Sequence, residues 1–349
     1  MGKHRAAIVG CGRMGTEHGR AYAARPDVDL VAIADPDPGN LAAFGQRFGV
    51  PGRARYADYR DLLARERVDI VGVVTPVRAT HGAVLAAVEA GVRGVFAEKP
   101  LAASLAEADE MVGACASAGV AFACGAIWRN HPDMQTAARL IRTENLIGRV
   151  LSVNVLGMAD EVSGGGCHSL NVVRLLAGAD ADWVIGWMPD PFGEHDQGAG
   201  GYLHLANGVD VFVHMEAGPK KGVEVLGEWG VFFWDWSNVR LWRLPQPWDA
   251  GRGFADLEPV PFPYARLADP GIYPGISGGL QSLLDAVEHG GEPLTSGDDM
   301  RRVLEIAIAL RESARGGRVP VALPIADRSL RIVPHPHRWL GAKPAAGSG

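Results

Sequence analysis

Short apolar runs alternate with stretches of helical spacing over the first 126 residues of the chain. The apolar runs cover residues 6–10, 28–35, 69–76, 94–100 and 120–126. Strands joined by helices lie parallel in one sheet, and the helices then cover both of its faces. The spacing therefore predicts a doubly wound α/β domain in this part of the chain.

A glycine-rich turn follows the first apolar run. Gly10, Gly12 and Gly15 form the pattern G-x-G-x-x-G between a predicted strand and a predicted helix. In such a loop one glycine makes the tight turn, one lets the backbone approach a pyrophosphate, and one lets the helix pack on the strand. The N–H groups at the helix start then face the pyrophosphate. The pattern predicts a dinucleotide site, with a plain glycine turn as the alternative.

An aspartate ends the second apolar run. Asp35 stands 20 residues after Gly15, where a carboxylate accepts a hydrogen bond from the ribose 2′-hydroxyl of the dinucleotide. The same carboxylate would repel a 2′-phosphate, and no arginine follows it closely. We therefore expect NAD as the cofactor, in preference to NADP.

Composition limits the partners of the chain. Its 349 residues carry a net charge of −6, which argues against nucleic acid or a membrane surface as the main partner. The sequence has no run of 18 apolar residues, so no transmembrane span is expected, and its first residues predict no secretion signal. The cysteines Cys11, Cys115, Cys124 and Cys167 lack C-x-x-C spacing. They are typical of reduced thiols, so a cytoplasmic protein is expected.

The pattern changes after residue 126. Alternating strands surround Asn207-Gly208, a two-residue hairpin signal that would set His204 opposite Val211 and His214 on the other face. The histidine spacings predict no metal site. We expect a dinucleotide-binding domain at 1–125, a substrate-binding and oligomerisation domain at 126–334, and a tail at 335–349 whose end is disordered.

Aromatic residues gather late in the second half. Apolar residues cover both faces of the strands there, so one face should meet helices and the other a second subunit. Sugar stacking is the alternative reading. The cluster contains Trp229, Phe232, Phe233, Trp234, Trp236, Trp242 and Trp248.

These motifs together resemble the Gfo/Idh/MocA family, named after glucose–fructose oxidoreductase, inositol dehydrogenase and MocA. The resemblance implies a Rossmann domain followed by an α/β domain with a large, mostly antiparallel sheet. It also implies oxidation or reduction of a sugar, cyclitol or related polyol with NAD(P), by a homodimer or homotetramer paired through that sheet. The matching stretches, in the family's order, are VGCGRMGTEH (9–18), IADPDP (33–38), VVTPVRATH (73–81), AEKPLA (97–102), IGRVLSV (147–153) and residues 294–324.

The segment Glu98-Lys99-Pro100 is the most specific of these matches. The resemblance implies that Lys99 reaches the substrate hydroxyl near the nicotinamide. A lysine ammonium beside a cationic ring gives up its proton more readily, so Lys99 can move a proton as hydride moves. The alternative is a lysine paired only with Glu98.

The stretch GGGCHSLNVV (164–173) places His168 at the entrance of a predicted helix. The resemblance implies that this histidine shares acid–base chemistry with Lys99. Relatives have an aspartate four residues before it and often another three residues after it, where this chain has Gly164 and Asn171. A nearby carboxylate makes a histidine a stronger base and fixes its orientation.

Three readings of the missing carboxylate stay open. Asp160 or Glu161 substitutes for it, Lys99 transfers the proton alone while His168 binds substrate, or the enzyme runs different chemistry. The alternative to any site role is a surface histidine that only caps the helix.

The predicted site can now be given in full. The predicted catalytic residues are Lys99 and His168. The predicted cofactor-binding residues are Gly10, Gly12, Arg13, Met14, Gly15, Asp35, Thr75, Pro76, His81, Glu98 and Lys99, with packing at a helix start as the alternative for His81. The predicted substrate-binding residues are Lys99, Arg129, Cys167, His168, Asn171 and Tyr273, with surface positions as the alternative for Arg129 and Tyr273.

The predicted function is that of an NAD-dependent dehydrogenase acting on CH–OH groups. One alternative keeps the fold but retains NAD through a redox-neutral cycle, as a lyase, epimerase or glycosidase. The other is a non-catalytic dinucleotide-binding partner protein.

Overall fold

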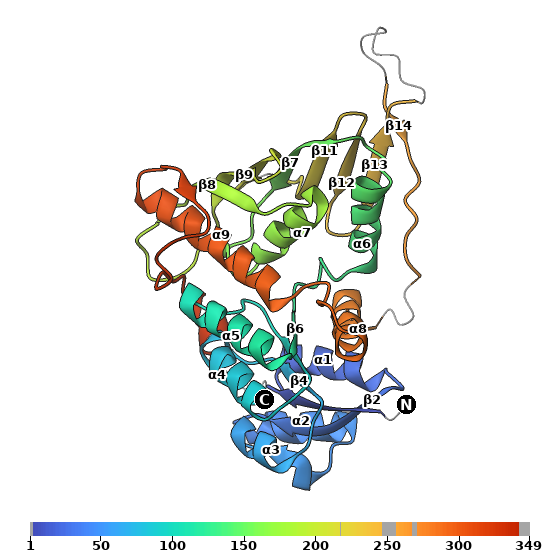
Figure 1. Cartoon of the computed structure of the whole chain (residues 1–349), viewed down its shortest axis with the longest axis vertical. Coiled ribbons are helices and arrows are strands. Elements are labelled where there is room, and N and C mark those ends of the chain that lie inside the picture. The colour runs from blue at the N-terminus through green and yellow to red at the C-terminus, as the bar shows by residue number, and fades with distance from the viewer. Residues whose placement is uncertain (1–2, 217, 246–255, 267–270, 342–349) are drawn as a thin grey trace, which may run out of the picture. The chain divides into compact units, whose positions relative to one another are not determined.

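The computed structural model describes residues 3–216, 218–245, 256–266 and 271–341 (Figure 1). The chain divides into two compact units. The first takes residues 1–131, 267–304 and 328–349, and the second takes 132–266 and 305–327. The sequence predicts one continuous second domain over 126–334, whereas residues 126–131, 267–304 and 328–334 of that range belong to the first unit. The end of the predicted tail, 342–349, lies outside the described residues.

Within the described residues, six strands form the parallel sheet of the first unit. Their order is β3-β2-β1-β4-β5-β6, which places the switch in strand order between β1 and β4. Ligands of such sheets bind at that switch, beyond the carboxyl ends of the strands. The predicted doubly wound sheet is confirmed, and the short strand β3 was not predicted. The strands are β1 (His4–Val9), β2 (Val28–Ala34), β3 (Arg55–Tyr56), β4 (Ile70–Val73), β5 (Gly94–Ala97) and β6 (Ala121–Cys124).

Helices pack in two groups around this sheet. One group joins α1 to α2 and α8, and the other joins α4 to α3 and α5. The side chains of Asp37 and Ser104 cap α2 and α5 by accepting from the backbone N–H of Asn40 and Glu107. The helices are α1 (Arg13–Ala23), α2 (Pro38–Phe48), α3 (Tyr59–Arg65), α4 (Val77–Glu89), α5 (Leu105–Ala118) and α8 (Pro274–His289), with a 3₁₀ turn at Gly52–Ala54.

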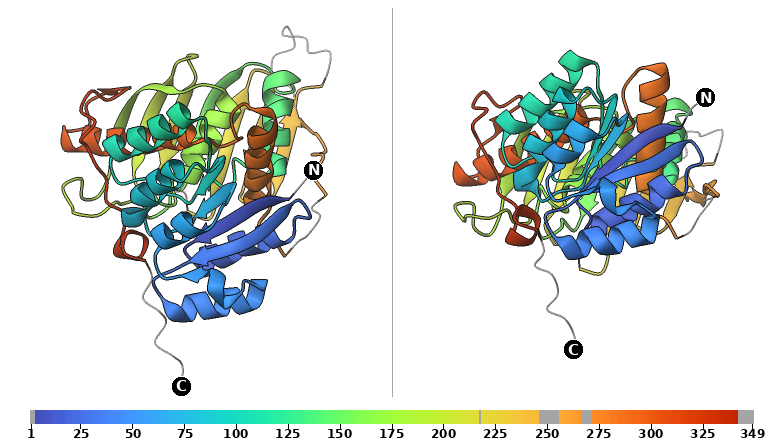
Figure 2. Two further views of the ribbon diagram at one scale, coloured as in Figure 1. Left: turned by 60° about the horizontal axis from the view of Figure 1, so that its bottom comes forward. Right: turned by 90° about the horizontal axis from the view of Figure 1, so that it is seen from below.

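Two late segments complete the first unit. Helix α8 packs on β5 and β6, and a Cβ added to Gly94 would lie 2.9 Å from Val287 (Figure 2). Near the end of the chain, the N–H of Ile332 donates to the carbonyl of Ala103, and Arg328 pairs with Asp109 of α5. The helix α10 (Pro336–Trp339) follows and packs on α4. The first unit therefore contains residues from both ends of the chain.

Nine strands of the described stretches form the sheet of the second unit. The order is β14-β13-β12-β11-β7-β10-β9-β8-β15, and its pairs are antiparallel except β7 with β10. The predicted large, mostly antiparallel sheet is confirmed. The strands are β7 (Val150–Leu156), β8 (Ala181–Trp187), β9 (Gly200–Leu205), β10 (Asp210–His214), β11 (Gly222–Gly227), β12 (Gly230–Trp234), β13 (Val239–Arg243), β14 (Glu258–Pro259) and β15 (Val321–Ala322).

Helices cover one face of this sheet. Helix α7 (Cys167–Ala177) packs on β7 and β11, whose alternate valines are buried. The carboxyl-terminal half of α9 (Gly297–Arg315) lies against β8, since a Cβ added to Gly186 would meet the Leu310 carbonyl oxygen at 2.3 Å. Helix α6 (Pro132–Ala138) continues into a π-helical turn at Arg139–Thr143 and also contacts α7.

The hairpin between β9 and β10 differs from its prediction by one residue. His204 lies opposite Asp210, not Val211, because the loop holds three residues and ends on Gly208 with φ +82°. A glycine in the left-handed region is the usual end of a three-residue hairpin loop. A shift of one residue exchanges the faces of a strand. His204 and His214 therefore lie on the same face, contrary to the prediction.

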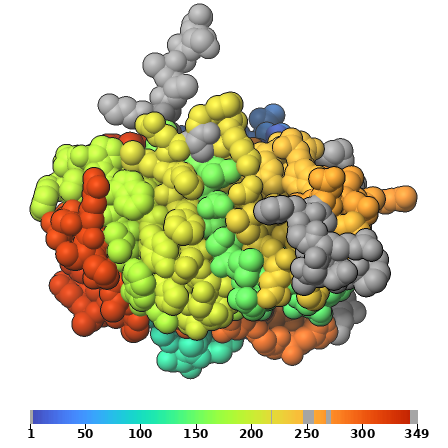
Figure 3. Space-filling model, turned by 90° about the horizontal axis from the view of Figure 1, so that it is seen from above, coloured from blue at the N-terminus to red at the C-terminus, as the bar shows by residue number. Residues whose placement is uncertain are grey.

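The other face of the nine-stranded sheet is the side seen in Figure 3. It carries partly exposed aromatic rings. Trp183, Tyr202 and Phe212 are in ring contact across three strands, and Phe212 is 44% exposed. Of the predicted aromatic cluster, Phe232, Phe233 and Trp234 are buried and Trp229 is partly exposed, while Trp248 lies outside the described residues.

Candidate dinucleotide and proton-transfer site

Two of the three loop glycines are required by packing within the chain. Gly10 has φ +97°, and a Cβ on it would lie 2.2 Å from the carbonyl oxygen of Val74, which follows β4. A Cβ on Gly15 would lie 2.0 Å from the carbonyl oxygen of Gly10. These contacts hold α1 tightly against the ends of β1 and β4.

Gly12 differs from both. It precedes α1 with φ −71°, a conformation open to any residue, and a Cβ on it would meet nothing within 4 Å. Packing within the chain therefore does not require a glycine there. Gly12 is the N-cap residue of α1, so it directly precedes the free N–H groups of the first turn, and no acidic residue lies in that turn. This cradle fits the pyrophosphate of a dinucleotide. Arg13, exposed, and Met14, half-buried, form the first turn.

Asp35 lies at the end of β2 and braces the same loop. One carboxylate oxygen accepts from the N–H of Cys11 at 2.7 Å, and the other accepts from the N–H of Asp37 at 2.8 Å. A carboxylate offers about four acceptor positions, so the ribose hydroxyl can still bind. Burial, with the Asp35 charge, raises the pKa of the Cys11 thiol well above its usual value. This thiol is therefore neutral and unreactive.

The carboxyl end of β4 carries three predicted cofactor residues. Thr75 and Pro76 form the link to α4, and the hydroxyls of Thr75 and Thr80 lie 3.1 Å apart. His81 points to the neighbouring helix, with Nε2 2.9 Å from a carboxylate oxygen of Glu110 in α5. Glu110 is largely exposed, so the contact between His81 and Glu110 lies at the surface of the protein.

The carboxyl end of β5 carries Glu98 and Lys99. Glu98 is buried, with one carboxylate oxygen 2.9 Å from Nε2 of His18 and the other accepting from the N–H of Lys99 at 3.1 Å. Lys99 is half-buried and precedes a cis proline. The Glu98 carboxylate therefore fixes the backbone that presents Lys99.

His18 was not among the predicted site residues. It is fully buried and lies on the face of α1 that also holds Gly15, Gly19 and Tyr22. The sequence does carry a signal for it. A polar residue on the helical spacing of small and apolar ones indicates a buried partner.

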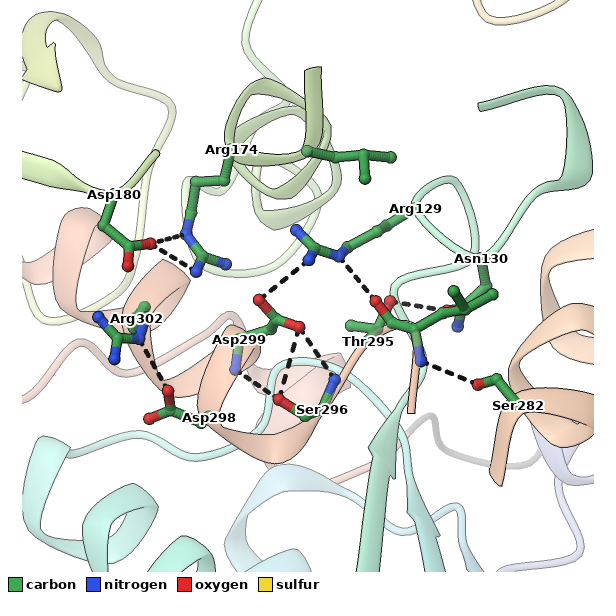
Figure 4. A network of polar contacts seen from close by, with 12 residues as sticks. Arg129, Asn130, Arg174, Asp180, Ser282, Thr295, Ser296, Asp298, Asp299 and Arg302 are labelled. Carbon is green, nitrogen blue, oxygen red and sulfur yellow. Dashed lines mark hydrogen bonds and ion pairs between the residues drawn. The ribbon is translucent and has the colours of Figure 1, made fainter. Parts of the chain in front are cut away.

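Arg129 is engaged within the first unit. Its guanidinium donates to the Leu294 carbonyl at 2.8 Å and lies 3.2 Å from Asp299, which also accepts from Ser296 at the start of α9 (Figure 4). These contacts tie the segment before α9 to the end of β6. Tyr273, which precedes α8, is 46% exposed.

Three predicted residues lie in the first turns of α7, in the second unit. His168 is half-buried, whereas Cys167 and Asn171 are buried. The Cys167 thiol donates to the Gly164 carbonyl at 3.0 Å. His168 and Asn171 are three residues apart and so share one side of the helix. The helix ends at Gly178, as predicted, but it starts at Cys167, so His168 lies inside its first turn and not ahead of the helix.

The two carboxylates considered as substitutes near His168 have opposite environments. Asp160 is exposed, while Glu161 is 3% exposed at the start of the turn that leads into α7. The sequence analysis missed a third carboxylate there. Asp196 is 1% exposed and accepts from both the N–H and the hydroxyl of Ser163 at 2.7 Å. No spacing indicates this contact, because Asp196 follows Ser163 by 33 residues in a glycine-rich loop.

Burial raises the pKa of Asp196, hydrogen bonds from Ser163 partly offset the rise, and the Glu161 charge adds to it.

Among the described residues, no group of three or more His, Cys, Asp and Glu is arranged to hold a metal ion. In the same part of the chain, no helix has both the length and the apolar character to cross a membrane.

Comparison with known proteins supports the geometry of the first unit. Residues 4–126 match the Gfo/Idh/MocA model, described as an oxidoreductase family with an NAD-binding Rossmann fold. The first unit is thus an NAD-binding Rossmann domain, and its loop geometry fits that cofactor.

Similar proteins extend over nearly the whole chain. D-apiose dehydrogenase of Paraburkholderia graminis is 28% identical, over 90% of this chain and 89% of that protein. The scyllo-inositol 2-dehydrogenase (NAD(+)) of Bacillus subtilis is 26% identical, over 92% of this chain and 96% of its own length. An oxidoreductase from Agrobacterium radiobacter, solved with NAD+, L-tartaric acid and magnesium, has a TM-score of 0.76 at 22% identity. It covers 92% of this chain and 98% of that one, and shares the fold.

Proposed function

Because its Rossmann unit belongs to the Gfo/Idh/MocA oxidoreductase family, we propose that this chain is an NAD-dependent dehydrogenase of a sugar, aminosugar or cyclitol. The observation that carries the proposal is the open cradle at Gly12, on the same strand-end edge as Lys99. Whole-length relatives named for D-apiose and scyllo-inositol oxidation support this substrate class.

The chemistry divides between the cofactor and the side chains. When bound, NAD supplies the acceptor or donor of a hydride from the substrate carbon. Lys99 holds the substrate hydroxyl and moves its proton, and Glu98 fixes the Lys99 backbone from behind. His168, from the second unit, is the proposed second acid–base group. Asn171 and Tyr273 are the proposed substrate contacts, and Cys167 supports the helix start.

The cofactor preference follows from Asp35. Its carboxylate already fixes Cys11 and Asp37, so it cannot turn away from the ribose without releasing the glycine loop. A 2′-phosphate would therefore meet a fixed negative charge. We propose NAD over NADP on this ground.

We also propose that two copies pair through the open face of the nine-stranded sheet. Partly exposed Trp183, Tyr202 and Phe212 form a contiguous aromatic surface there. Native mass spectrometry of the purified protein tests the proposal, and a monomer at micromolar concentration would contradict it.

The proposed activity is tested by NADH binding and by a panel of sugars and cyclitols followed at the NADH absorbance band. We expect added NADH to bind and at least one polyol to reduce NAD. Retention of about one NAD per subunit through purification, with no net reduction by any polyol, would instead favour the redox-neutral reading. Absence of NADH binding would contradict the proposal outright.

A further inference from the structure

The loop between β8 and β9 holds the turn that presents His168. Asp196 of this loop accepts hydrogen bonds from the Ser163 hydroxyl and N–H at 2.7 Å and from the Val162 N–H at 3.2 Å. The Val162 N–H also donates to the carbonyl of Gln197 at 2.9 Å. These bonds attach two consecutive residues of the turn to two consecutive residues of the loop.

The loop itself is fixed by two arginines of α9. Arg311 and Arg315 both donate to the Pro191 carbonyl, and Arg311 also donates to the carbonyl of Gly193. Arg311 is 4% exposed, so its side chain is held inside the second unit. A Cβ on Gly198 would lie 2.8 Å from the Ala159 carbonyl oxygen, which shows how closely loop and turn pack. The loop that carries Asp196 is therefore fixed in place by α9 and by its packing on the turn.

Backbone hydrogen bonds connect the turn, residues 161–166, directly to the start of α7. The N–H groups of Gly165 and Gly166 donate to the Glu161 carbonyl, and the N–H of His168 donates to that of Gly165. A Cβ on Gly166 would lie 2.7 Å from the Val162 carbonyl oxygen, so the backbone of the turn is tightly packed at this point. A displacement of Val162 and Ser163 therefore displaces His168.

We propose that Asp196 is the positioning residue for His168, acting through Ser163 and the turn 161–166. The proposal rests on the proposed function, because it assigns Asp196 to the acid–base group of that reaction. A carboxylate suits the position because it accepts several N–H and O–H donors at once. An amide of the same shape would turn its own N–H group toward one of these donors.

The test compares three variants of the full chain. Asp196→Asn keeps the shape and removes acceptor capacity, and Ser163→Ala removes one of the three hydrogen bonds. Asp190→Asn is the matched control, because Asp190 lies on the exposed start of the same loop, where its side chain accepts from the Phe192 N–H. Each protein is measured for kcat, for the NADH dissociation constant, for Tm, and for hydrogen exchange of the peptide 157–170.

We expect Asp196→Asn to lower kcat about 10- to 100-fold, the size of a displacement of a catalytic group by about an ångström. The NADH dissociation constant should stay within about twofold, and exchange at Val162 and Ser163 should accelerate. Ser163→Ala should lower kcat less, and the two changes should not be additive in a double-mutant cycle. Asp190→Asn should have the kcat, NADH dissociation constant, Tm and hydrogen exchange of the wild type.

Unchanged kcat in Asp196→Asn, or a fall in kcat explained by an equal loss of folded protein, would overturn the proposal. Failure of the proposed function is distinguishable from this. In that case the wild type binds no NADH or oxidises no polyol, while the exchange measurement still reports whether Asp196 holds the turn.

Discussion

His18 and Glu98 are joined by a contact of 2.9 Å between Nε2 and Oε1, both buried, and they connect the dinucleotide helix α1 to the strand end that carries Lys99. The same residue types meet at the same distance between His81 and Glu110, but that pair lies at the surface. The chain therefore contains a matched pair of His–Glu contacts that differ in burial.

Glu98→Ala should lower stability by about 1–3 kcal/mol, because it leaves His18 without its acceptor in a buried site. The Lys99 N–H loses its partner in the same variant, so kcat should fall as well. Glu110→Ala should change neither quantity measurably, since exposed pairs contribute little. Thermal unfolding of the three proteins side by side is the measurement. Equal effects of the two substitutions would contradict the expectation.

Lys99→Ala should lower kcat about 10²- to 10⁴-fold, the range associated with loss of a positioned acid or base. The NADH dissociation constant should change little, because the pyrophosphate cradle lies at Gly12. Steady-state kinetics with the best polyol of the panel, together with NADH fluorescence titration, separates the two quantities. Wild-type kcat in the Lys99→Ala variant would show that Lys99 has no part in proton transfer.

Gly12→Ala and Gly15→Ala should fail in different ways. A Cβ at position 12 meets nothing in the chain, so this variant should fold normally and lose at least about tenfold in NADH affinity. A Cβ at position 15 collides with the Gly10 carbonyl, so that variant should lose about 3 kcal/mol of stability. Gly113→Ala, in the open surface of α5, is the control. Undiminished NADH binding by Gly12→Ala would show that the cradle is not the cofactor site.

Asp35→Ser should move the preference from NAD toward NADP. The substitution removes the charge facing the 2′ position, and the serine hydroxyl still accepts one of the loop N–H bonds. We expect the ratio of kcat/KM for NAD to that for NADP to fall about tenfold or more. A ratio unchanged from the wild type would assign cofactor preference to other residues.

The buried Asp196 makes a prediction about pH. Its pKa is raised in the folded protein, so in the range just above pH 3.8 the folded state binds more protons than the unfolded state. The contribution of this residue to stability therefore falls as pH rises through that range. The difference in unfolding free energy between wild type and Asp196→Asn should shift against the wild type by about 1.4 kcal/mol per unit of pKa difference. Urea unfolding at several pH values measures it, and a pH-independent difference would contradict the expectation.

The first unit could be predicted in most of its elements because its signals are local. The run of Gly10, Gly12 and Gly15 and the aspartate at the end of β2 are each recognisable within a short stretch of sequence. The hairpin register depended on whether the loop took two or three residues, a choice that the Asn-Gly pair alone does not decide.

The remaining features depend on contacts between distant residues. Asp196 meets Ser163 across 33 positions, and nothing in either local stretch indicates the other. Helix α8 has an ordinary amphipathic pattern, which fits either sheet equally well. Its pairing with β5 and β6 is decided by shape, since Gly94 and Gly279 leave room for close approach.

The arrangement of α8 also fixes an order of events during synthesis. Strand β6 leaves the ribosome 150 residues before α8 begins, counting from Cys124 to Pro274. Until then, the side of β5 that packs on α8, where the Phe96 ring meets Gly279, lacks its covering helix. The backbone hydrogen bond from the Ile332 N–H to the Ala103 carbonyl forms later still, because Ile332 follows α8 in the sequence. The unit that begins with the glycine loop is thus completed by a contact whose second partner is translated after every described strand of the second unit.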